Sequence, residues 1–446
     1  MKHFVNYGYK ALLLISIYLF IFGLGIFAFE HPKTKTNAAF DIDVLNHESE
    51  TALYATIIEN NSAALKTRLA LIDAATETID LSIYSIHNDH AKHIIYHALY
   101  EAAERGVRVR FLIDGFVEGG MYFDDPGLDF LTMHENIEIK YYNTFALTHP
   151  HDVHNRMHDK LLIVDDYYAL MSGRNIGDRY FFGETLYDRD VLIYGSDSQV
   201  INAMTNYFNA VYHYPLSEVY QNTEDPSIRE MLAAAYNTYI TDYPINDTID
   251  NLMLDAIQIT QALFIHNPLT AIPKHPLVLE TLVDIAKDEE DIIIQSPYFV
   301  ITKDMKRVLD PLMGQALTIL TNSATTNTNV VAAGGYLKDR DAIIADATIY
   351  EYDGAMLHAK SMVFGDDISV IGSLNMDPRS AYLSTESMLV IVSEPFNHLL
   401  RTQMDDMIDD SVLITENSPA IDNASFTRRI AIRITQILFY PFERLL

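Results

Sequence analysis

The chain has 446 residues, of which 61 are acidic and 31 basic, so its formal net charge is −30 with neutral histidines. Domains that bind nucleic acids place Lys and Arg against phosphates and are usually basic, so this balance argues against a nucleic-acid binder but allows a local positive pocket for one phosphate group. There is no cysteine, which excludes disulfides, a cysteine nucleophile and a thiolate metal site. With 49% hydrophobic residues, the chain is long enough for two or three domains with sizeable cores.

The N-terminus carries an uncharged apolar run of 19 residues, Ala11 to Phe29. As a helix it would measure about 28 Å, close to the ~30 Å hydrocarbon core of a bilayer, so it predicts a transmembrane anchor within residues 1–30. Lys2 and Lys10 favour a cytoplasmic N-terminus and a body on the periplasmic or extracytoplasmic side of the cell membrane, although two lysines after the run weaken this orientation. A cleaved signal peptide is disfavoured, because its apolar region is usually about 7 to 15 residues long and no small-residue cleavage site follows.

The chain after the predicted anchor contains an internal repeat of predicted helices and strands. In the first half, apolar residues at helical spacing predict a helix from about Leu65 to Ala75, and strands are predicted at 79–86 and 107–114, with a helix between them that stops at Gly106. The same order returns as a helix over 277–287, a strand at 291–295, a helix that ends before Gly314 and a strand at 316–320. The repetition predicts two α/β domains, at 31–220 and 277–412, each a mixed β-sheet flanked by helices.

The remaining segments differ in composition from the two repeats. Residues 221–276 are acidic and contain prolines, which predicts a linker, and residues 413–446 form a C-terminal tail. In the tail, Arg428 to Leu446 holds four Arg and one Glu, with Ile430, Ile434, Ile437 and Leu438 along one helical stripe. A basic amphipathic helix of this kind suggests docking at an anionic membrane surface, and a helix packed on the core is the alternative.

Each half contains one cluster of polar residues after a predicted strand, at 137–142 or 347–352. His158 and Lys160 precede the strands 161–164 and 168–171, and His358 and Lys360 precede the strands 361–364 and 368–371. Residues i and i+2 of a strand share a face, so each His and its Lys can project into one pocket. An imidazole can attack the phosphorus of a phosphodiester while Lys and Asn side chains stabilise the charged oxygens.

Packing of the halves about a pseudo-twofold axis would bring both clusters to a single site. One His would then be the neutral nucleophile and the other, protonated, would donate to the leaving oxygen. With both pKa values near 6.5, about a fifth of molecules hold this combination at pH 7, so large pKa shifts are unnecessary. Lys, Asn and imidazolium supply the positive charge, and neither a metal nor another cofactor is expected.

The pattern H-x-K-x4-D followed by G-S-x-N, present twice over roughly residues 65–410, resembles the phospholipase D superfamily. The segments 174–181 (RNIGDRYF), 296–300 (SPYFV) and 372–386 (GSLNMDPRSAYLSTE) resemble its cardiolipin synthase branch, in particular the periplasm-facing, singly anchored type. The resemblance implies a phosphatidyltransferase that joins a phosphatidyl group to a headgroup alcohol through a phosphohistidine.

The resemblance also implies roles for individual residues. The active-site histidines are His158 and His358, and an acid further along the chain orients each imidazole, for which Asp190 and Glu386 are the candidates. The residues expected at the phosphate are Lys160, Lys360, Asn175, Asn375 and Ser373. The acids are expected to fix the tautomer and direction of each ring more than to change its charge.

The second copy departs from the pattern at Gly365, where the first has Asp165, and the first copy has Ser172-Gly173 in place of Gly-Ser. We interpret the motif Asp as a structural hydrogen-bonding residue of the turn, so its loss affects local geometry more than activity.

Two acidic or histidine-rich segments have alternative readings. His149, His151, His154 and His158 are close in sequence and could suggest a metal site, but the spacing fits no ligand signature, and a substrate-entry loop is favoured. Residues 124–129 (DDPGLD) lack the Gly and Glu spacing of a calcium loop and are expected to be a solvated turn.

The sequence therefore predicts a membrane-anchored phosphatidyltransferase of cardiolipin synthase type. The expected partners are phospholipid substrates such as phosphatidylglycerol and a membrane, with no nucleic acid, and the sequence leaves the need for a helper protein open. Hydrolysis to phosphatidic acid is the main alternative, and a nuclease or an inactive lipid-binding scaffold, the latter motivated by Gly365, are the others.

Overall fold

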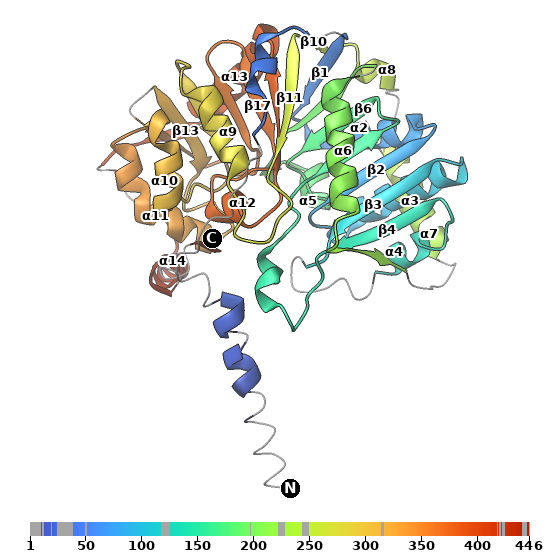
Figure 1. The fold of residues 1–446 in the computed structure, drawn as a ribbon, viewed down its shortest axis with the longest axis horizontal. Helices are drawn as coiled ribbons and strands as arrows, with labels where there is room; N and C mark the ends of the chain where they lie inside the picture. The colour runs from blue at the N-terminus through green and yellow to red at the C-terminus, as the bar shows by residue number, and fades with distance from the viewer. Residues whose placement is uncertain are drawn as a thin grey trace.

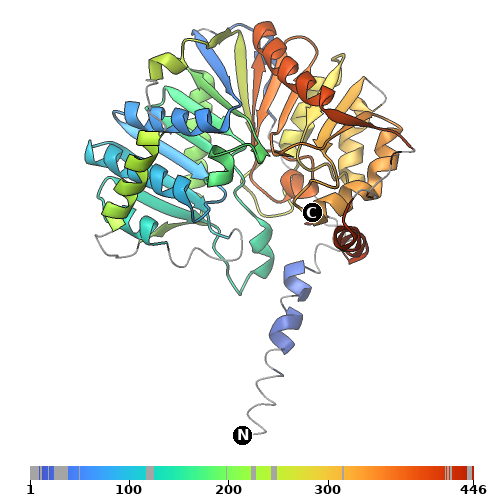
Figure 2. The ribbon, with the colours of Figure 1, turned by 180° about the vertical axis from the view of Figure 1, so that it is seen from behind.

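The computed structural model describes residues 10, 13–18, 20–24, 39–49, 51–116, 125–196, 198–221, 228–242, 249–313, 316–416, 418, 421, 424–438 and 444–445. Two lobes stand side by side, each with one twisted sheet covered by helices on both faces (Figures 1 and 2).

The first lobe contains a nine-stranded sheet with mixed pairing. Its order is β10 (Ile257–Ile259), β1 (Leu53–Ile58), β8 (Asp190–Tyr194), β6 (Tyr168–Ser172), β5 (Leu161–Val164), β2 (Thr78–Ile83), β3 (Arg108–Asp114), β4 (Ile137–Tyr142) and β9 (Ser217–Tyr220). The neighbours β2, β3 and β4 are parallel and the other pairs are antiparallel. The connections between the parallel strands contain helices, as parallel pairing requires.

The second lobe repeats this arrangement in an eight-stranded sheet. Its order is β11 (Gln261–His266), β18 (Ser387–Val392), β17 (Ile368–Gly372), β16 (Ser361–Phe364), β12 (Ile292–Gln295), β13 (Leu317–Asn322), β14 (Thr348–Tyr352) and β19 (Ser411–Ile414). Again the three strands β12, β13 and β14 are parallel. From β1 to β9 and from β11 to β19 the two sheets match strand for strand, which confirms the repeat predicted from the sequence.

Helices cover both faces of each sheet. The first lobe has α2 (Asn61–Ala74), α3 (His90–Glu104), α4 (Pro126–Leu131), α5 (Asp178–Phe181), α6 (Gln199–Tyr212), α7 (Ile228–Asp242) and α8 (Ile249–Leu252). The second has α9 (Leu277–Ala286), α10 (Lys303–Leu309), α11 (Val330–Ile344), α12 (Pro378–Tyr382), α13 (Glu394–Asp409) and α14 (Phe426–Leu438). Short turns of helix are η1 (Phe20–Leu24), η3 (Ile42–Asn46), η4 (Pro150–His154) and η5 (Asp310–Leu312).

Local sequence signals explain where several helices begin and end. The side chain of Asn60 accepts a hydrogen bond from the Ala63 amide at 2.9 Å and caps α2. After α3, Gly106 has φ +96°, a left-handed conformation that stops the helix at low steric cost. At α4, Asp125 accepts from the amides of Gly127 and Leu128. Asp125 and Asp129 are buried, so the prediction of a solvated turn here was wrong for the part of 124–129 that the structure describes.

A shared apolar cluster joins the lobes. It contains Met204 and Phe208 of α6 with Ile193 of β8, and Leu400 and Phe396 of α13 from the second lobe. In Figure 1, α6 lies in front of the first sheet, and in Figure 2, α13 lies in front of the second. Each fully buried aliphatic or aromatic side chain of this kind contributes about 1.5–3 kcal/mol, so the junction is itself a hydrophobic core.

The segment expected as a linker, 221–276, takes part in both lobes. Its helix α7 packs against α3, β10 extends the first sheet beside β1, and β11 pairs with β18 in the second. The short step from β10 to β11 is therefore where the chain passes from one sheet to the other.

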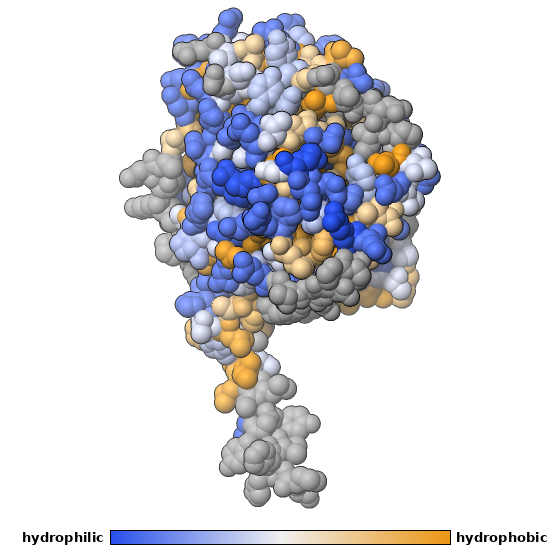
Figure 3. Space-filling view, turned by 90° about the vertical axis from the view of Figure 1, so that its right-hand side faces the viewer, coloured by the Kyte–Doolittle hydropathy of each residue, from blue (hydrophilic) through white to orange (hydrophobic). Residues whose placement is uncertain are grey.

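The N-terminal segment projects away from the lobes in both ribbon views, and hydrophobic residues gather on it while the first lobe beside it is largely hydrophilic (Figure 3). No helix in the described part of the chain is long and apolar enough to cross a bilayer. Part of the predicted anchor within residues 1–30 falls outside the described residues, and the anchor stays a prediction.

Candidate active site

The two motif histidines lie where the lobes meet, and each is bound through its backbone to the opposite lobe. The His158 amide donates to the Thr385 carbonyl at 3.1 Å, and the His358 amide donates to the Tyr187 carbonyl at 2.7 Å. The second contact belongs to a two-stranded parallel ladder between β7 (Leu186–Tyr187) and β15 (Met356–Leu357). These reciprocal contacts are those that a pseudo-twofold axis between the lobes requires.

Each imidazole also contacts the carboxyl group of an acid from the other lobe. Nδ1 of His158 lies 3.0 Å from both carboxyl oxygens of Glu386. Nδ1 of His358 lies 2.6 Å from Oδ2 of Asp188. A carboxyl oxygen that accepts from Nδ1–H fixes the ring tautomer and leaves Nε2 as the nitrogen that can react.

Asp190 is not the acid beside His358, so that sequence prediction was wrong. Its carboxyl group pairs with the guanidinium groups of Arg68 and Arg174, at 2.7 and 3.0 Å, and accepts from the Ser172 hydroxyl. These contacts lie inside the first lobe and support the turn after β6. Asp188, two residues earlier, holds the position next to the imidazole.

Strand register explains the displacement. Ser172 pairs with Asp190 between β6 and β8, and its counterpart Gly372 pairs with Met388 between β17 and β18. Counting back two residues from each partner gives Asp188 and Glu386, which are therefore equivalent. The same alignment can be seen in the sequence. When the apolar runs 191–194 and 389–392 are aligned, an acid stands three residues before the start of each run.

The motif lysines lie beside their histidines in extended segments just before β5 and β16. Lys160 donates from Nζ to the His158 carbonyl at 2.5 Å, and Lys360 donates to the His358 carbonyl, with Nζ 2.9 Å from Nδ1 of that ring. The i, i+2 geometry of a strand therefore holds only approximately, because both side chains turn back onto their own histidine. The two ammonium groups nevertheless lie within the same buried junction.

Two tyrosines that sequence reasoning missed pack edge-on against the imidazoles. The rings of Tyr84 and His158 have centroids 4.6 Å apart, and those of Tyr180 and His358 have centroids 5.7 Å apart. Tyr180 also accepts a hydrogen bond from the Asn175 amide at 3.0 Å. Tyr180 belongs to the RNIGDRYF segment, which was singled out for its resemblance alone.

Burial changes the titration of both histidines, contrary to the expectation of nearly unperturbed rings. It lowers the pKa of His158 well below its usual value, and Lys160 and Lys360 act in the same direction. Burial and Lys360 lower the pKa of His358 to about 3 against the opposing effect of Asp188. Without a bound anion, both rings are neutral at pH 7.

The two acids differ sharply from one another. Burial favours the neutral form of Asp188, but His358 and Lys360 outweigh it and hold the pKa of this carboxyl well below its usual range. Burial raises the pKa of Glu386 to about 8, although Lys160 opposes the shift. At neutral pH the acid beside His358 is therefore charged, and the acid beside His158 is largely uncharged.

The second-lobe serine of the motif holds the acid in place. Ser373 donates from its hydroxyl to Glu386 at 2.5 Å and accepts from the Ser387 amide at 3.0 Å. In the first lobe this position is Gly173, where a Cβ atom would lie 2.2 Å from Oδ1 of Asp188. The reversed Ser-Gly order of the first copy thus makes room for its acid.

The asparagines of the motif differ in their partners. Asn175 accepts from the Ser85 amide at 3.2 Å. Oδ1 of Asn375 is buried and has no hydrogen-bond partner among the described residues. An unsatisfied acceptor of this kind costs about 1–3 kcal/mol, and a ligand that donates a hydrogen bond, such as an alcohol, would satisfy it.

The motif Asp165 stabilises a turn and does not enter the site. Its carboxylate accepts from the backbone amides of Thr76, Glu77 and Thr78 at 2.7–2.8 Å. At the matching place, Gly365 has φ +54°, and its carbonyl accepts from Arg401 of α13 at 2.8 Å. These contacts agree with the interpretation of this Asp as a structural residue of the turn, and in the second lobe Arg401 forms a hydrogen bond with the turn instead.

The histidine-rich segment before His158 does not converge on a point. His154 contacts the Gly23 carbonyl at 3.0 Å, the rings of His149 and His151 have centroids 6.3 Å apart, and His158 is bound to Glu386. Within the described residues, no group of three or more potential ligands could hold a metal ion.

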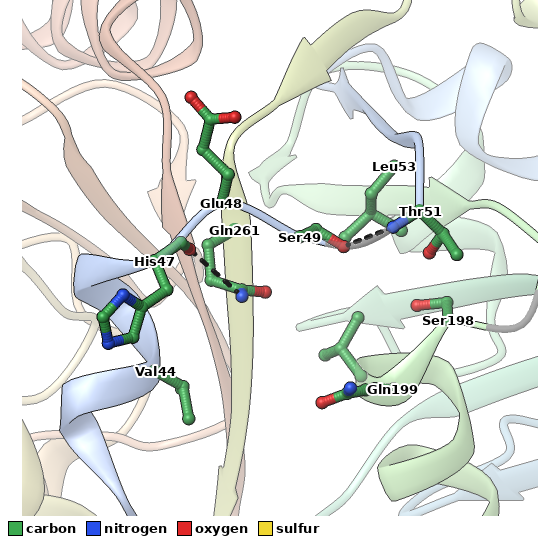
Figure 4. Close-up of a pocket in the computed structure, with 10 residues that line it drawn as sticks. Val44, His47, Glu48, Ser49, Thr51, Leu53, Ser198, Gln199 and Gln261 are labelled. Carbon is green, nitrogen blue, oxygen red and sulfur yellow. Dashed lines mark hydrogen bonds between the residues drawn. The ribbon is translucent and has the colours of Figure 1, made fainter.

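Two hollows lie near the junction, but neither motif histidine lines them. The first, of about 210 Å³, is formed by the stretch from Val44 to Leu53, the start of α6 and Gln261 of β11 (Figure 4). The second, of about 490 Å³, is bordered by β7 and includes Tyr187 and Tyr352.

Comparison with known proteins agrees with the geometry. The family described as "Cardiolipin synthase, PLD-like domain" matches residues 69–212 and 281–408, one stretch in each lobe. The chain belongs to this phospholipase D-like family. It is thus an enzyme of the cardiolipin synthase-like, phosphatidyltransferase type, as the sequence motifs predicted.

Similar proteins span nearly the whole chain. Cardiolipin synthase C of Escherichia coli is 29% identical over 469 residues, which cover 90% of this chain and 97% of that protein. An uncharacterised protein of Helicobacter pylori is 28% identical over 406 residues, with 80% of each chain covered. The solved phosphatidylserine synthase of Haemophilus influenzae has the same fold, with a TM-score of 0.65, 15% identity and coverage of 91% of this chain and 98% of that one.

Proposed function

We propose that this enzyme transfers a phosphatidyl group from a phospholipid such as phosphatidylglycerol to the headgroup alcohol of a second phospholipid, through a phosphohistidine. The observation that supports the proposal most strongly is the reciprocal pairing of His158 with Glu386 and of His358 with Asp188 across the lobe junction. Two imidazoles held in this way, with a lysine beside each, can act from opposite sides on one phosphorus atom.

In the first step, Nε2 of His158 attacks the phosphorus of the donor and forms the N–P bond as the P–O bond to the donor's headgroup breaks. His358 gives a proton to the departing headgroup oxygen, which leaves as an alcohol. Lys160, Lys360 and the amide of Asn375 stabilise the negative non-bridging oxygens.

The difference between the acids supports this assignment. The charged Asp188 favours a protonated His358, whereas the largely neutral Glu386 favours a neutral, nucleophilic His158. The anionic phosphodiester brings negative charge between the lysines, which raises the pKa of both imidazoles, and His358 beside its carboxylate takes up the proton first.

In the second step, the acceptor alcohol takes the place of the first headgroup. His358, now neutral, removes its proton as the oxygen attacks phosphorus, and the N–P bond to His158 breaks. With a phosphatidylglycerol acceptor the product is cardiolipin, and the alcohol released in the first step is glycerol. No nucleic-acid partner is proposed.

We propose further that the enzyme is held at the cell membrane by its N-terminal segment, with both lobes on the extracytoplasmic side. Leu13, Leu14 and Phe20 of this segment are more than half exposed, and Tyr18 donates to the Leu147 carbonyl at 3.1 Å. This contact, together with that of His154 to Gly23, joins the segment to the loop that leads to His158.

Incubation of the purified full chain with labelled phosphatidylglycerol tests the reaction. Cardiolipin and glycerol are the expected products, and His158→Ala should form neither. Phosphatidic acid as the sole lipid product would overturn the transferase proposal in favour of hydrolysis.

Rapid quenching followed by peptide mass spectrometry tests the intermediate. A phosphatidyl adduct on His158 is expected, and an adduct on His358 would reverse the two roles. Active enzyme without an adduct on either histidine would refute the covalent route.

A further inference from the structure

Among the residues that the structure describes, the helix α14 packs against the second lobe through one face. Its Ile432 is fully buried in a small cluster with Ala324 and Ala333. At Gly334 of α11 a Cβ atom would lie 2.6 Å from Oγ1 of Thr435, so the two helices approach closely. The Arg428 guanidinium donates to the Ala324 carbonyl at 2.8 Å and fixes the start of the helix.

The opposite face of α14 is an apolar stripe. It consists of Phe426, Ile430, Ile434 and Ile437, whose exposed fractions are 68%, 41%, 48% and 75%. Steps of four, four and three residues place these side chains on one side of a helix. Single exposed apolar residues are ordinary on a protein surface, but a contiguous stripe marks an interaction site.

The charge around the stripe has the opposite sign to that of the whole molecule. Residues 426–438 contain Arg428, Arg429 and Arg433 and no acid, in a chain of net charge −30. A second copy docked on this stripe would bring two arginine sets together with no carboxylate from either helix, which disfavours self-association. An anionic surface with an apolar interior matches both properties of the face.

The position of α14 agrees with such a surface. In both ribbon views it lies at the side of the lobes from which the N-terminal segment projects (Figures 1 and 2). Leu147, in the loop bound by Tyr18 of that segment, is 61% exposed. We propose that α14 lies flat on a bilayer rich in anionic phospholipid, with its apolar stripe at the acyl boundary and its arginines among the headgroups.

This contact is separate from the N-terminal anchor. It would hold the second lobe against the bilayer, whereas the anchor and the loop before His158 hold the first, so both halves of the junction would face the lipid. The inference does not depend on whether the enzyme transfers or hydrolyses, and its test reports contact with lipid and not turnover.

The chain has no Trp, so a single introduced Trp is an unambiguous reporter. Phe426→Trp in the full chain, reconstituted into nanodiscs with brominated acyl chains, should lose roughly half or more of its emission when the discs contain phosphatidylglycerol, and less in zwitterionic discs. The matched control is Leu254→Trp, at a position 78% exposed just after α8, which lies on the opposite side of the molecule from α14 (Figure 1). Its emission should not respond to bromine.

Addition of Ile434→Glu and Ile437→Glu to the Phe426→Trp chain should abolish the quenching, with circular dichroism as the check on folding. Equal responses of the two Trp reporters would overturn the proposal. Equal quenching in zwitterionic and anionic discs would overturn the assignment to anionic lipid. A blue shift without lipid that grows with protein concentration would assign the stripe to a second copy instead.

Discussion

The unequal acids beside the two histidines lead to a sharp prediction. At pH 7, Asp188→Asn removes a buried negative charge next to His358, whereas Glu386→Gln replaces a group that is already largely neutral. With Asp188 Oδ2 2.6 Å from Nδ1, the charge centres lie about 4 Å apart, and at an effective dielectric constant of about 20 their attraction is about 4 kcal/mol. Since ~1.4 kcal/mol is a tenfold change in rate, Asp188→Asn should lower kcat about a thousandfold.

Glu386→Gln should cost much less. It exchanges one neutral hydrogen bond for another, a difference of about 1 kcal/mol, so kcat should fall roughly tenfold or less below pH 8. As the pH rises through about 8, wild-type Glu386 becomes charged and favours the positive charge that develops on His158, so the ratio of wild-type to variant rates should increase. Asp188 itself is charged over this whole range, so any pH dependence of the ratio for Asp188→Asn reports on Lys360, whose pKa of about 8 is lowered by burial and raised by Asp188.

The assay is the single-turnover rate with labelled phosphatidylglycerol across pH 6 to 9, and circular dichroism checks that each variant is folded. Asp190→Asn is the control: its partners are Arg68 and Arg174, so it should lower stability while the folded fraction retains its rate. Equal losses for Asp188→Asn and Glu386→Gln at pH 7, or a larger loss for the latter, would refute the assignment of unequal charge.

Three further outcomes concern stability. Asp165→Ala removes the acceptor for three backbone amides and should lower the free energy of unfolding by about 3 kcal/mol in chemical denaturation. The specific activity of the folded enzyme should not change. A loss of activity without a loss of stability would contradict the role of Asp165 in the turn. Burial lowers the pKa of Lys274 from 10.5 to about 7, so between these pH values the folded state binds fewer protons than the unfolded state. The free energy of unfolding of the wild type should therefore rise by up to about 4 kcal/mol relative to that of Lys274→Met from pH 7 to pH 10. A difference in melting temperature that circular dichroism finds constant over this range would exclude this effect. Asp159→Ala leaves the hydroxyls of Tyr207, Thr385 and Ser387 without their shared acceptor at the junction. It should lower both the melting temperature and kcat, and Asp159→Asn should recover part of each. An unchanged melting temperature would show that this hydrogen-bond network does not hold the lobes together.

Much of the fold could be predicted because its strands are short apolar runs bounded by polar turns. The sequence segments 161–164, 168–171, 361–364 and 368–371 are strands β5, β6, β16 and β17 to within one residue. The doubled order of elements likewise predicted two matched sheets. The acidic, proline-containing segment 221–276 was harder, because strands such as β10 owe their place to pairing with β1 and not to their own pattern.

The site residues could be predicted wherever the spacing between motif residues is the same in both halves of the chain. His158 and His358, with their lysines, stand 200 residues apart, but the spacing changes before the acids: Asn175 and Asp188 are 13 positions apart, and Asn375 and Glu386 are 11. The first lobe has two extra residues between α5 and β8, and only the strand register restores the alignment. That the acids cross to the opposite lobe could not be predicted, because it depends on how the lobes dock.

Each lobe supplies the acid that contacts the histidine of the other lobe, and this arrangement has consequences for how the two-lobed chain could arise and for what one lobe could do alone. A lobe expressed alone would carry an imidazole whose carboxylate partner sits on the missing half, so it could become competent only by pairing with a copy of itself. Duplication and fusion of such a half would turn a concentration-dependent assembly into a permanent one, after which each copy became able to diverge. The charged Asp188 and the neutral Glu386 are what such divergence would leave behind: one inherited geometry carrying two specialised roles.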